Sequence, residues 1–170
     1  MIEPDATDAF DELLRANRTF ANTFELADFD GIAHAGVAMV TCMDSRIDPL
    51  RMIGLAPGDA KILRNPGGRV TDQALVALVV SVHLLNVDRI MIVQHTRCAV
   101  ASSSEQDMLK RLGEASGQDA SWMTVGVIDD QPATLRADVI RVRSHPLIGE
   151  SVLVGGFLYD VDTGLLERLA

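Results

Sequence analysis

Residues 89–98 read Arg-Ile-Met-Ile-Val-Gln-His-Thr-Arg-Cys, an apolar run that ends in a histidine and a cysteine three positions apart. A short run of this kind is typical of a strand that is buried on both faces of a parallel sheet. Residues 36–41 form a second such run, and Cys42 follows it directly. Residues 61–64 lie between these two segments and could add another strand. The pattern favours a parallel sheet whose strands end in reactive side chains.

Helical patterns separate these runs and continue beyond them. The apolar spacing over residues 7–26 predicts a first helix, and Thr71 can cap a helix that runs to about residue 85. We also expect a short helix between Pro49 and Gly54, helices over residues 104–112 and 134–142, strands over 122–128 and 151–159, and a returning segment at 165–169. This alternation predicts an α/β fold: a mostly parallel central sheet of four to five strands, flanked by helices on both faces. Because no repeat or linker divides the chain, we expect a single domain over residues 1–170.

The composition narrows the classes of function. The chain has 24 acidic and 15 basic residues, which argues against a nucleic-acid partner because such binding depends on clustered basic charge. The longest apolar region, residues 74–93, contains His83, Asp88 and Arg89, so no membrane span is expected. The N-terminus has neither a basic region nor an apolar run and does not read as a secretory signal, so the cytoplasm is the expected location. In that reducing compartment, we expect no disulfide between the two cysteines.

Three side chains at the ends of two predicted strands are candidate metal ligands. Ligand sites form beyond the carboxyl ends of parallel strands, and neighbouring strands would bring Cys42, His95 and Cys98 to one place. Two thiolates and one imidazole suit tetrahedral Zn²⁺, and they balance its charge when the histidine is neutral. The sequence therefore predicts a zinc centre with an open fourth position, where a bound water would ionise near about pH 7.

Asp44 and Arg46 follow Cys42 at every second position, so an extended chain would point all three side chains to one side. Asp44 could occupy the fourth position on zinc and close the site. It could instead pair with Arg46 and accept a hydrogen bond from a zinc-bound hydroxide. The sequence leaves both arrangements open.

The same residues allow simpler interpretations. A free cysteine is often a small buried apolar side chain, but two cysteines and a histidine at strand ends favour a metal. A structural zinc would need a fourth protein ligand, either Asp44 or one of the remaining histidines. Those histidines lack a converging partner, so we expect no chemical role for them: His34, His83 and His145. Gly67-Gly68 is interpreted as a tight turn, with backbone amides that approach the site as the less favoured alternative.

Three motifs, taken together, resemble the β-class carbonic anhydrases of the compact prokaryotic type. They are Cys42-Met43-Asp44-Ser45-Arg46, Arg64-Asn65-Pro66-Gly67-Gly68 and His95-Thr96-Arg97-Cys98, and their combined order and spacing are specific. The resemblance implies the zinc-dependent, reversible hydration of CO2 to bicarbonate and a proton, by attack of zinc hydroxide. It also implies that Cys42, His95 and Cys98 hold the zinc, with Asp44 and Arg46 as the catalytic pair.

The resemblance further implies a homodimer or a dimer of dimers, with active sites near the subunit interface. Residues 1–30 would then be an N-terminal helical arm that embraces the second subunit, although the apolar stripe by itself could equally pack on its own core. Gln94 and Ala99 differ from the glycines that are usual at these positions. Two alternative functions are a zinc hydrolase of CO2-like molecules, such as carbon disulfide or carbonyl sulfide, and a non-catalytic zinc- or bicarbonate-binding relative. Asp44 and Arg46 favour an enzyme.

Overall fold

The computed structural model describes residues 8–170, which form two compact units that divide after Asp30. The first unit contains a 3₁₀ turn, Asp8–Phe10, and helix α1, Asp11–Ala21. This helix is shorter than the predicted span of residues 7–26, whose first residue lies outside the described chain. It ends early because both the N–H and the hydroxyl of Thr23 donate to the carbonyl of Phe20, which tightens the last turn.

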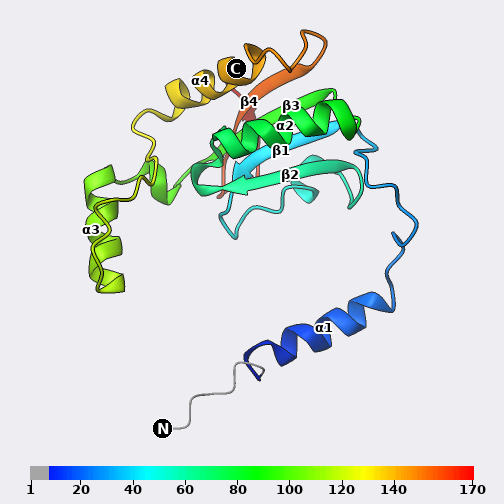
Figure 1. The fold of residues 1–170 in the computed structure, drawn as a ribbon, viewed down its shortest axis with the longest axis horizontal. Helices are drawn as coiled ribbons and strands as arrows, with labels where there is room; N and C mark the ends of the chain where they lie inside the picture. The colour runs from blue at the N-terminus through cyan, green and yellow to red at the C-terminus, as the bar shows by residue number, and fades with distance from the viewer. Residues whose placement is uncertain (1–7) are drawn as a thin grey trace. The chain divides into compact units, whose positions relative to one another are not determined.

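The second unit is built on a five-stranded sheet (Figure 1). Its strands are β1 (Val37–Cys42), β2 (Ala60–Asn65), β3 (Arg89–His95), β4 (Leu153–Tyr159) and β5 (Leu166–Arg168). Their order is β2-β1-β3-β4-β5, and every neighbouring pair is parallel except β4 and β5. The predicted, mostly parallel α/β sheet is therefore confirmed. Because Thr41 pairs with Val93, the carboxyl ends of β1 and β3 lie side by side.

Three helices belong to this unit, and side-chain caps define where they begin. They are α2 (Asp72–Leu84), α3 (Glu105–Ser116) and α4 (Gln131–Arg143). Thr71, as predicted, accepts a hydrogen bond from an N–H of the first turn of α2, and Ser104 and Asp130 do the same for α3 and α4. Short 3₁₀ turns connect the other segments: Arg51–Ile53, Pro66–Gly68 and Ala99–Ala101.

Helices α2 and α4 cover the same face of the sheet (Figure 1). Leu78 of α2 and Val139 of α4 join one core with alternate residues of β1 and β3, namely Ala38, Val40, Ile90 and Ile92. We expected helices on both faces, but the two helices that pack on the sheet, α2 and α4, share one face. An open groove of about 590 Å³ lies around the amino ends of β1, β3 and β4, and its apolar lining includes Val37, Met91 and Val154. Within residues 8–170, no helix combines the length and the apolar character that crossing a membrane requires.

The strand predicted over residues 122–128 is not present, and this prediction was wrong. The N–H groups of residues 125–127 donate to the carboxylate of Glu105 at 2.5–3.1 Å, and that of Ile128 donates to the carbonyl of Val100 at 2.8 Å. Backbone donors that are used in this way cannot join the ladder of a sheet. The apolar pattern of the segment reflects packing beside α3 rather than pairing with a strand.

Candidate metal centre

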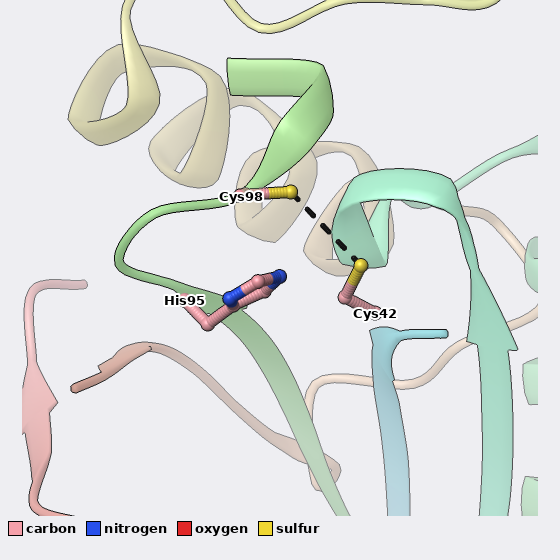
Figure 2. A group of neighbouring side chains, drawn as sticks. All are labelled: Cys42, His95 and Cys98. Carbon is pink, nitrogen blue, oxygen red and sulfur yellow. Dashed lines mark hydrogen bonds between the residues drawn. The ribbon is translucent and has the colours of Figure 1, made fainter. Parts of the chain in front are cut away.

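Strands β1 and β3 bring the three predicted ligands together (Figure 2). Cys42 is the last residue of β1, His95 is the last residue of β3, and Cys98 follows after one tight turn. Arg97 makes this turn possible, because its left-handed backbone (φ 53°) reverses the chain between the two ligands of the third motif. The three ligand atoms lie within 4.8 Å of one another, and all three residues are buried.

The geometry of this trio fits a bound metal ion. The sulfur atoms of Cys42 and Cys98 are 4.0 Å apart, close to the about 3.8 Å expected for two thiolates on one tetrahedral zinc. His95 Nδ1 lies 2.9 Å from the carbonyl oxygen of Thr96, so this nitrogen carries the proton and Nε2 keeps its lone pair. Nε2 is buried and has no hydrogen-bond partner in the described part of the chain. The lone pair of His95 Nε2 is therefore free to bind a metal ion beside the two thiols.

The close packing of the three groups also shifts their pKa values. The hydrogen bond between the two thiols lowers the pKa of Cys42 and raises that of Cys98. Burial opposes the charged imidazolium, but the charge of the neighbouring Cys42 and the carbonyl oxygen of Thr96 raise the pKa of His95 above its usual value. A zinc ion needs two thiolates and a neutral imidazole, so its binding releases the protons that these groups hold.

The glycine turn after β2 takes part in the centre, which was the less favoured of the two interpretations. The N–H of Gly67 donates to Cys42 Sγ at 3.3 Å. Gly68 (φ +64°) lies so close to β1 and β3 that a Cβ there would be 2.6 Å from the carbonyl oxygen of Val93 and 3.0 Å from the nitrogen of Cys42. Interpretation as a plain turn was therefore wrong, because the turn contacts Cys42, one of the predicted metal ligands.

Asp44 is paired with Arg46 at the edge of this group. Arg46 Nε donates to Asp44 Oδ1 at 2.9 Å, and Nη2 donates to Oδ2 at 2.7 Å. These bonds, together with one from the Arg46 backbone N–H, hold the pKa of Asp44 well below its usual range. Asp44 Oδ2 lies 3.9 Å from His95 Nε2. Of the two arrangements left open by the sequence, the structure contains the arginine-paired one.

Two further residues brace the ligands, and neither was given a role from the sequence. Arg64 donates to the carbonyl oxygens of Cys42 (3.0 Å) and Asp44 (2.6 Å), which fixes the backbone that carries them. Its position at the end of β2, next to β1, was the available signal. Gln131 Nε2 donates to the carbonyl of His95 at 2.9 Å. No sequence signal identifies Gln131, because α4 reaches this point only through the tertiary fold.

The remaining histidines lie outside the three-residue group. His83 Nε2 is 2.7 Å from the carbonyl oxygen of Leu147, and His145 Nδ1 accepts the N–H of the same residue at 3.2 Å. Gln94 is fully buried, and its two amide atoms have no hydrogen-bond partner among residues 8–170. Ala99 is exposed, so its methyl group does not crowd the thiols.

Comparison with known proteins identifies the family of this chain. The family model for carbonic anhydrase matches residues 37–166. β-Carbonic anhydrase 1 of Mycobacterium tuberculosis is 30% identical over 133 residues, 78% of this chain and 81% of that protein. A carbonic anhydrase structure from Streptococcus mutans has a TM-score of 0.86 and 34% identity, covering 95% of this chain and 97% of that one. A carbon disulfide hydrolase of Acidithiobacillus thiooxidans is 28% identical over 163 residues, 81% of this chain and 74% of that protein. The chain therefore belongs to the carbonic anhydrase family, in its β class of zinc enzymes that interconvert carbon dioxide and bicarbonate.

Proposed function

We propose that this chain hydrates CO2 reversibly to bicarbonate and a proton at the centre formed by Cys42, His95 and Cys98. The observation that carries the assignment is the two-point pairing of Asp44 with Arg46 beside the three ligand atoms. A metal with a purely structural role is normally held by four protein ligands. Here the nearest carboxylate is held by an arginine instead, which supports a free fourth position.

Each residue then has a defined task. When bound, zinc would act as a Lewis acid that makes water a usable nucleophile near neutral pH. Asp44 stays ionised and offers an acceptor of fixed direction, which can orient the proton of a reacting water. Arg46 holds Asp44 in that direction, and the N–H of Gly67 satisfies one lone pair on Cys42.

The surroundings of the thiols suit a small apolar substrate. Cys42 and Cys98 belong to an apolar cluster that includes Ile47, Val100 and Ile128. Met52, Ala101, Met108, Val125 and Tyr159 pack against it. Such a lining favours a linear, uncharged molecule such as CO2 over a charged substrate.

A second candidate is the hydrolysis of carbon disulfide or carbonyl sulfide. Its support is the 28% identity with a carbon disulfide hydrolase over 81% of this chain. These molecules are linear and apolar like CO2, so the shape of the pocket, rather than the ligand set, would distinguish the two activities.

We also propose that the chain works as a homodimer or a dimer of dimers in the cytoplasm, with residues 1–30 as an arm on a second copy. The support is that α1 has no buried residue, although it carries an apolar stripe. The apolar groove around the amino ends of β1, β3 and β4 is a second surface that another copy could cover. Thiolate metal ligands suit a reducing compartment.

The test is stopped-flow CO2 hydration by protein whose zinc content has been measured. We expect about one zinc per chain and a rate that rises as the pH increases through about 7. Background rates from about pH 6 to about pH 9 with zinc bound would contradict the proposal. Faster turnover of carbon disulfide than of CO2 by the same preparation would favour the second candidate.

A further inference from the structure

Glu105 uses its carboxylate to hold a segment far along the chain. Oε1 accepts the N–H of Val125 at 2.5 Å, and Oε2 accepts those of Gly126 and Val127 at 3.1 and 3.0 Å. Gly126 (φ 78°) turns the chain so that three consecutive N–H groups converge on one anion. These hydrogen bonds, above all the one from Val127, lower the pKa of Glu105, so it is ionised at neutral pH.

This contact is not a requirement of helix α3, of which Glu105 is the first residue. Ser104 already caps the helix, because its hydroxyl oxygen accepts the N–H of Asp107 at 3.1 Å. An acidic residue in the first turn usually serves its own helix by facing the free N–H groups there. The Glu105 carboxylate faces residues 125–127 instead, so its hydrogen bonds serve a different part of the fold.

The segment that Glu105 holds has neither helix nor strand to fix it. Its neighbouring backbone bonds lie at its two ends, from Met123 N–H to Ala120 and from Ile128 N–H to Val100. Between them, the N–H groups of residues 125–127 have the Glu105 carboxylate as their acceptor. The hydrogen bonds that hold the middle of this segment therefore all come from one side chain.

The same segment forms part of the apolar lining beside the metal ligands. Ile128 is buried in the cluster that contains Cys42 and Cys98, and Val125 packs against that cluster. Ile128 also touches Gly67, because a Cβ at that glycine would lie 3.0 Å from Ile128 Cδ1. Gly67 is the residue whose N–H donates to Cys42. A shift of residues 125–128 would therefore change the space next to the centre.

We propose that Glu105 is a positioning residue that fixes residues 125–128 as the apolar wall of the substrate pocket. The inference rests on the proposed hydration of CO2. In the described part of the chain, the hydrogen bonds of the Glu105 carboxylate go to residues 125–127 and not to Cys42, His95 or Cys98, so it acts on the fit of the substrate rather than on the reacting groups. Loosening the wall weakens the binding of CO2 and enlarges the space for longer linear molecules such as carbon disulfide.

The test compares Glu105→Ala and Glu105→Gln with the matched control Glu114→Ala. Glu114 lies on the same helix and pairs with Lys110 at 3.9 Å, with 66% of its side chain exposed, so the control removes the same charge without touching the wall. Glutamine keeps one acceptor oxygen but turns an NH2 group toward a backbone N–H, so its effect should lie between wild type and alanine. Zinc content, kcat, KM for CO2 and amide hydrogen exchange at residues 125–127 are measured for each variant.

In Glu105→Ala we expect exchange at residues 125–127 to rise by roughly tenfold or more. KM for CO2 should rise several-fold with kcat and zinc content little changed, and turnover of carbon disulfide relative to CO2 should increase. Glu114→Ala should match wild type in every measurement. A proportional loss of kcat and zinc, or an unchanged KM despite faster exchange, would overturn the proposal.

If Glu105→Ala fails to fold, Glu105→Gln and Val125→Ala keep the proposal open to refutation. Val125→Ala trims the wall directly and leaves the carboxylate and its acceptor oxygens in place. It should raise KM for CO2 without raising amide exchange at residues 126 and 127, and an unchanged KM in both variants would count against the wall. If zinc-loaded wild type does not hydrate CO2, the proposed function fails, while the exchange data still report whether Glu105 holds the segment.

Discussion

Cys42 shows how much of this centre depends on single residues. Its sulfur accepts the N–H of Gly67, and its carbonyl oxygen accepts the guanidinium of Arg64. Its backbone nitrogen lies against Gly68. Cys42 is thus held by Arg64, near the end of the neighbouring strand β2, and by the glycine turn that follows this strand. Each of these contacts can be tested separately.

The substitution Gly68→Ala should destabilise the protein by about 3 kcal/mol and lower its zinc content. The new Cβ would lie 2.6 Å from the carbonyl oxygen of Val93, a backbone atom that cannot move without disturbing β3. Gly54→Ala is the matched control, since Gly54 has a similar φ of +70° but no atom within 4 Å of the added Cβ. The control should lose only about 1–2 kcal/mol from backbone strain. Urea unfolding measures the free energy of unfolding of both variants. Equal losses in the two variants would refute the role of the close contact between Gly68 and Val93.

Replacing the Asp44 carboxylate distinguishes a catalytic partner from a metal ligand. Asp44→Asn should lower kcat/KM for CO2 by roughly 100-fold while zinc content stays at the wild-type level, because Asp44 is bound to Arg46 and not to the metal position. Asp48→Asn provides the control, since Asp48 is 59% exposed and the asparagine oxygen can still accept the Arg51 N–H that Asp48 Oδ1 accepts at 3.3 Å. Loss of zinc from Asp44→Asn would identify Asp44 as a ligand instead.

At the scale of elements, the parallel register of the sheet decides which residues meet. Strands β1 and β3 are neighbours with Thr41 opposite Val93, so the residues after them reach the same edge. Strand β2 lies on the other side of β1 and delivers Arg64 and the glycine turn to that edge. Helix α4 contributes Gln131, its first residue, whose side chain donates to the carbonyl of His95. The centre is thus a property of strand order, in keeping with ligand sites at the carboxyl ends of α/β sheets.

The contact between α3 and residues 125–127 should make stability depend on pH in acid. The folded-state pKa of Glu105 lies below its usual 4.5, so the stabilisation by its ionised form is complete above about pH 4.5 and is lost as the pH falls through the lower folded value. Glu105→Gln should therefore lower the urea midpoint by a constant amount from about pH 7 to about pH 4.5, and by less in stronger acid. A difference between wild type and Glu105→Gln that does not change in acid would show that the charge is not responsible.

At the scale of the whole molecule, the described residues of the N-terminal unit form no core of their own. Helix α1 has no buried residue. Its large apolar side chains and those just after it are each at least 48% exposed: Phe10, Leu13, Leu14, Phe20 and Phe24. A short amphipathic helix gains most of its stability from packing of its apolar face. We expect a second copy of the chain to supply that packing.

Phe20→Glu should therefore shift the protein toward monomers and lower its melting temperature. The substitution places a charge in the apolar stripe, where burial against another copy would be costly. Thr19→Glu is the control, because residue 19 lies on the opposite face of the helix and receives the same charge. Analytical ultracentrifugation measures the association. Wild type that sediments as a monomer, or two variants that associate equally, would contradict the role of the arm.

Short-range patterns in the sequence predicted the α/β class, the helix cap at Thr71 and the convergence of Cys42, His95 and Cys98. These features depend on short-range information: apolar periodicity, cap chemistry at Thr71, and the position of Cys42 and His95 at strand ends. The resemblance of its motifs to the β-class carbonic anhydrases also came from residues that are close in the chain. Comparison with known proteins confirmed the family.

How Cys42, His95 and Cys98 are supported could be seen only in the folded chain. In the fold, Asp44 pairs with Arg46, the N–H of Gly67 donates to Cys42, and residues 122–128 lie outside the sheet. Sequence periodicity reports which side chains are apolar, but it does not report which backbone donors are already used. The Glu105 carboxylate lies 20 to 22 positions from the amides that it binds, so this contact exists only once the chain has folded.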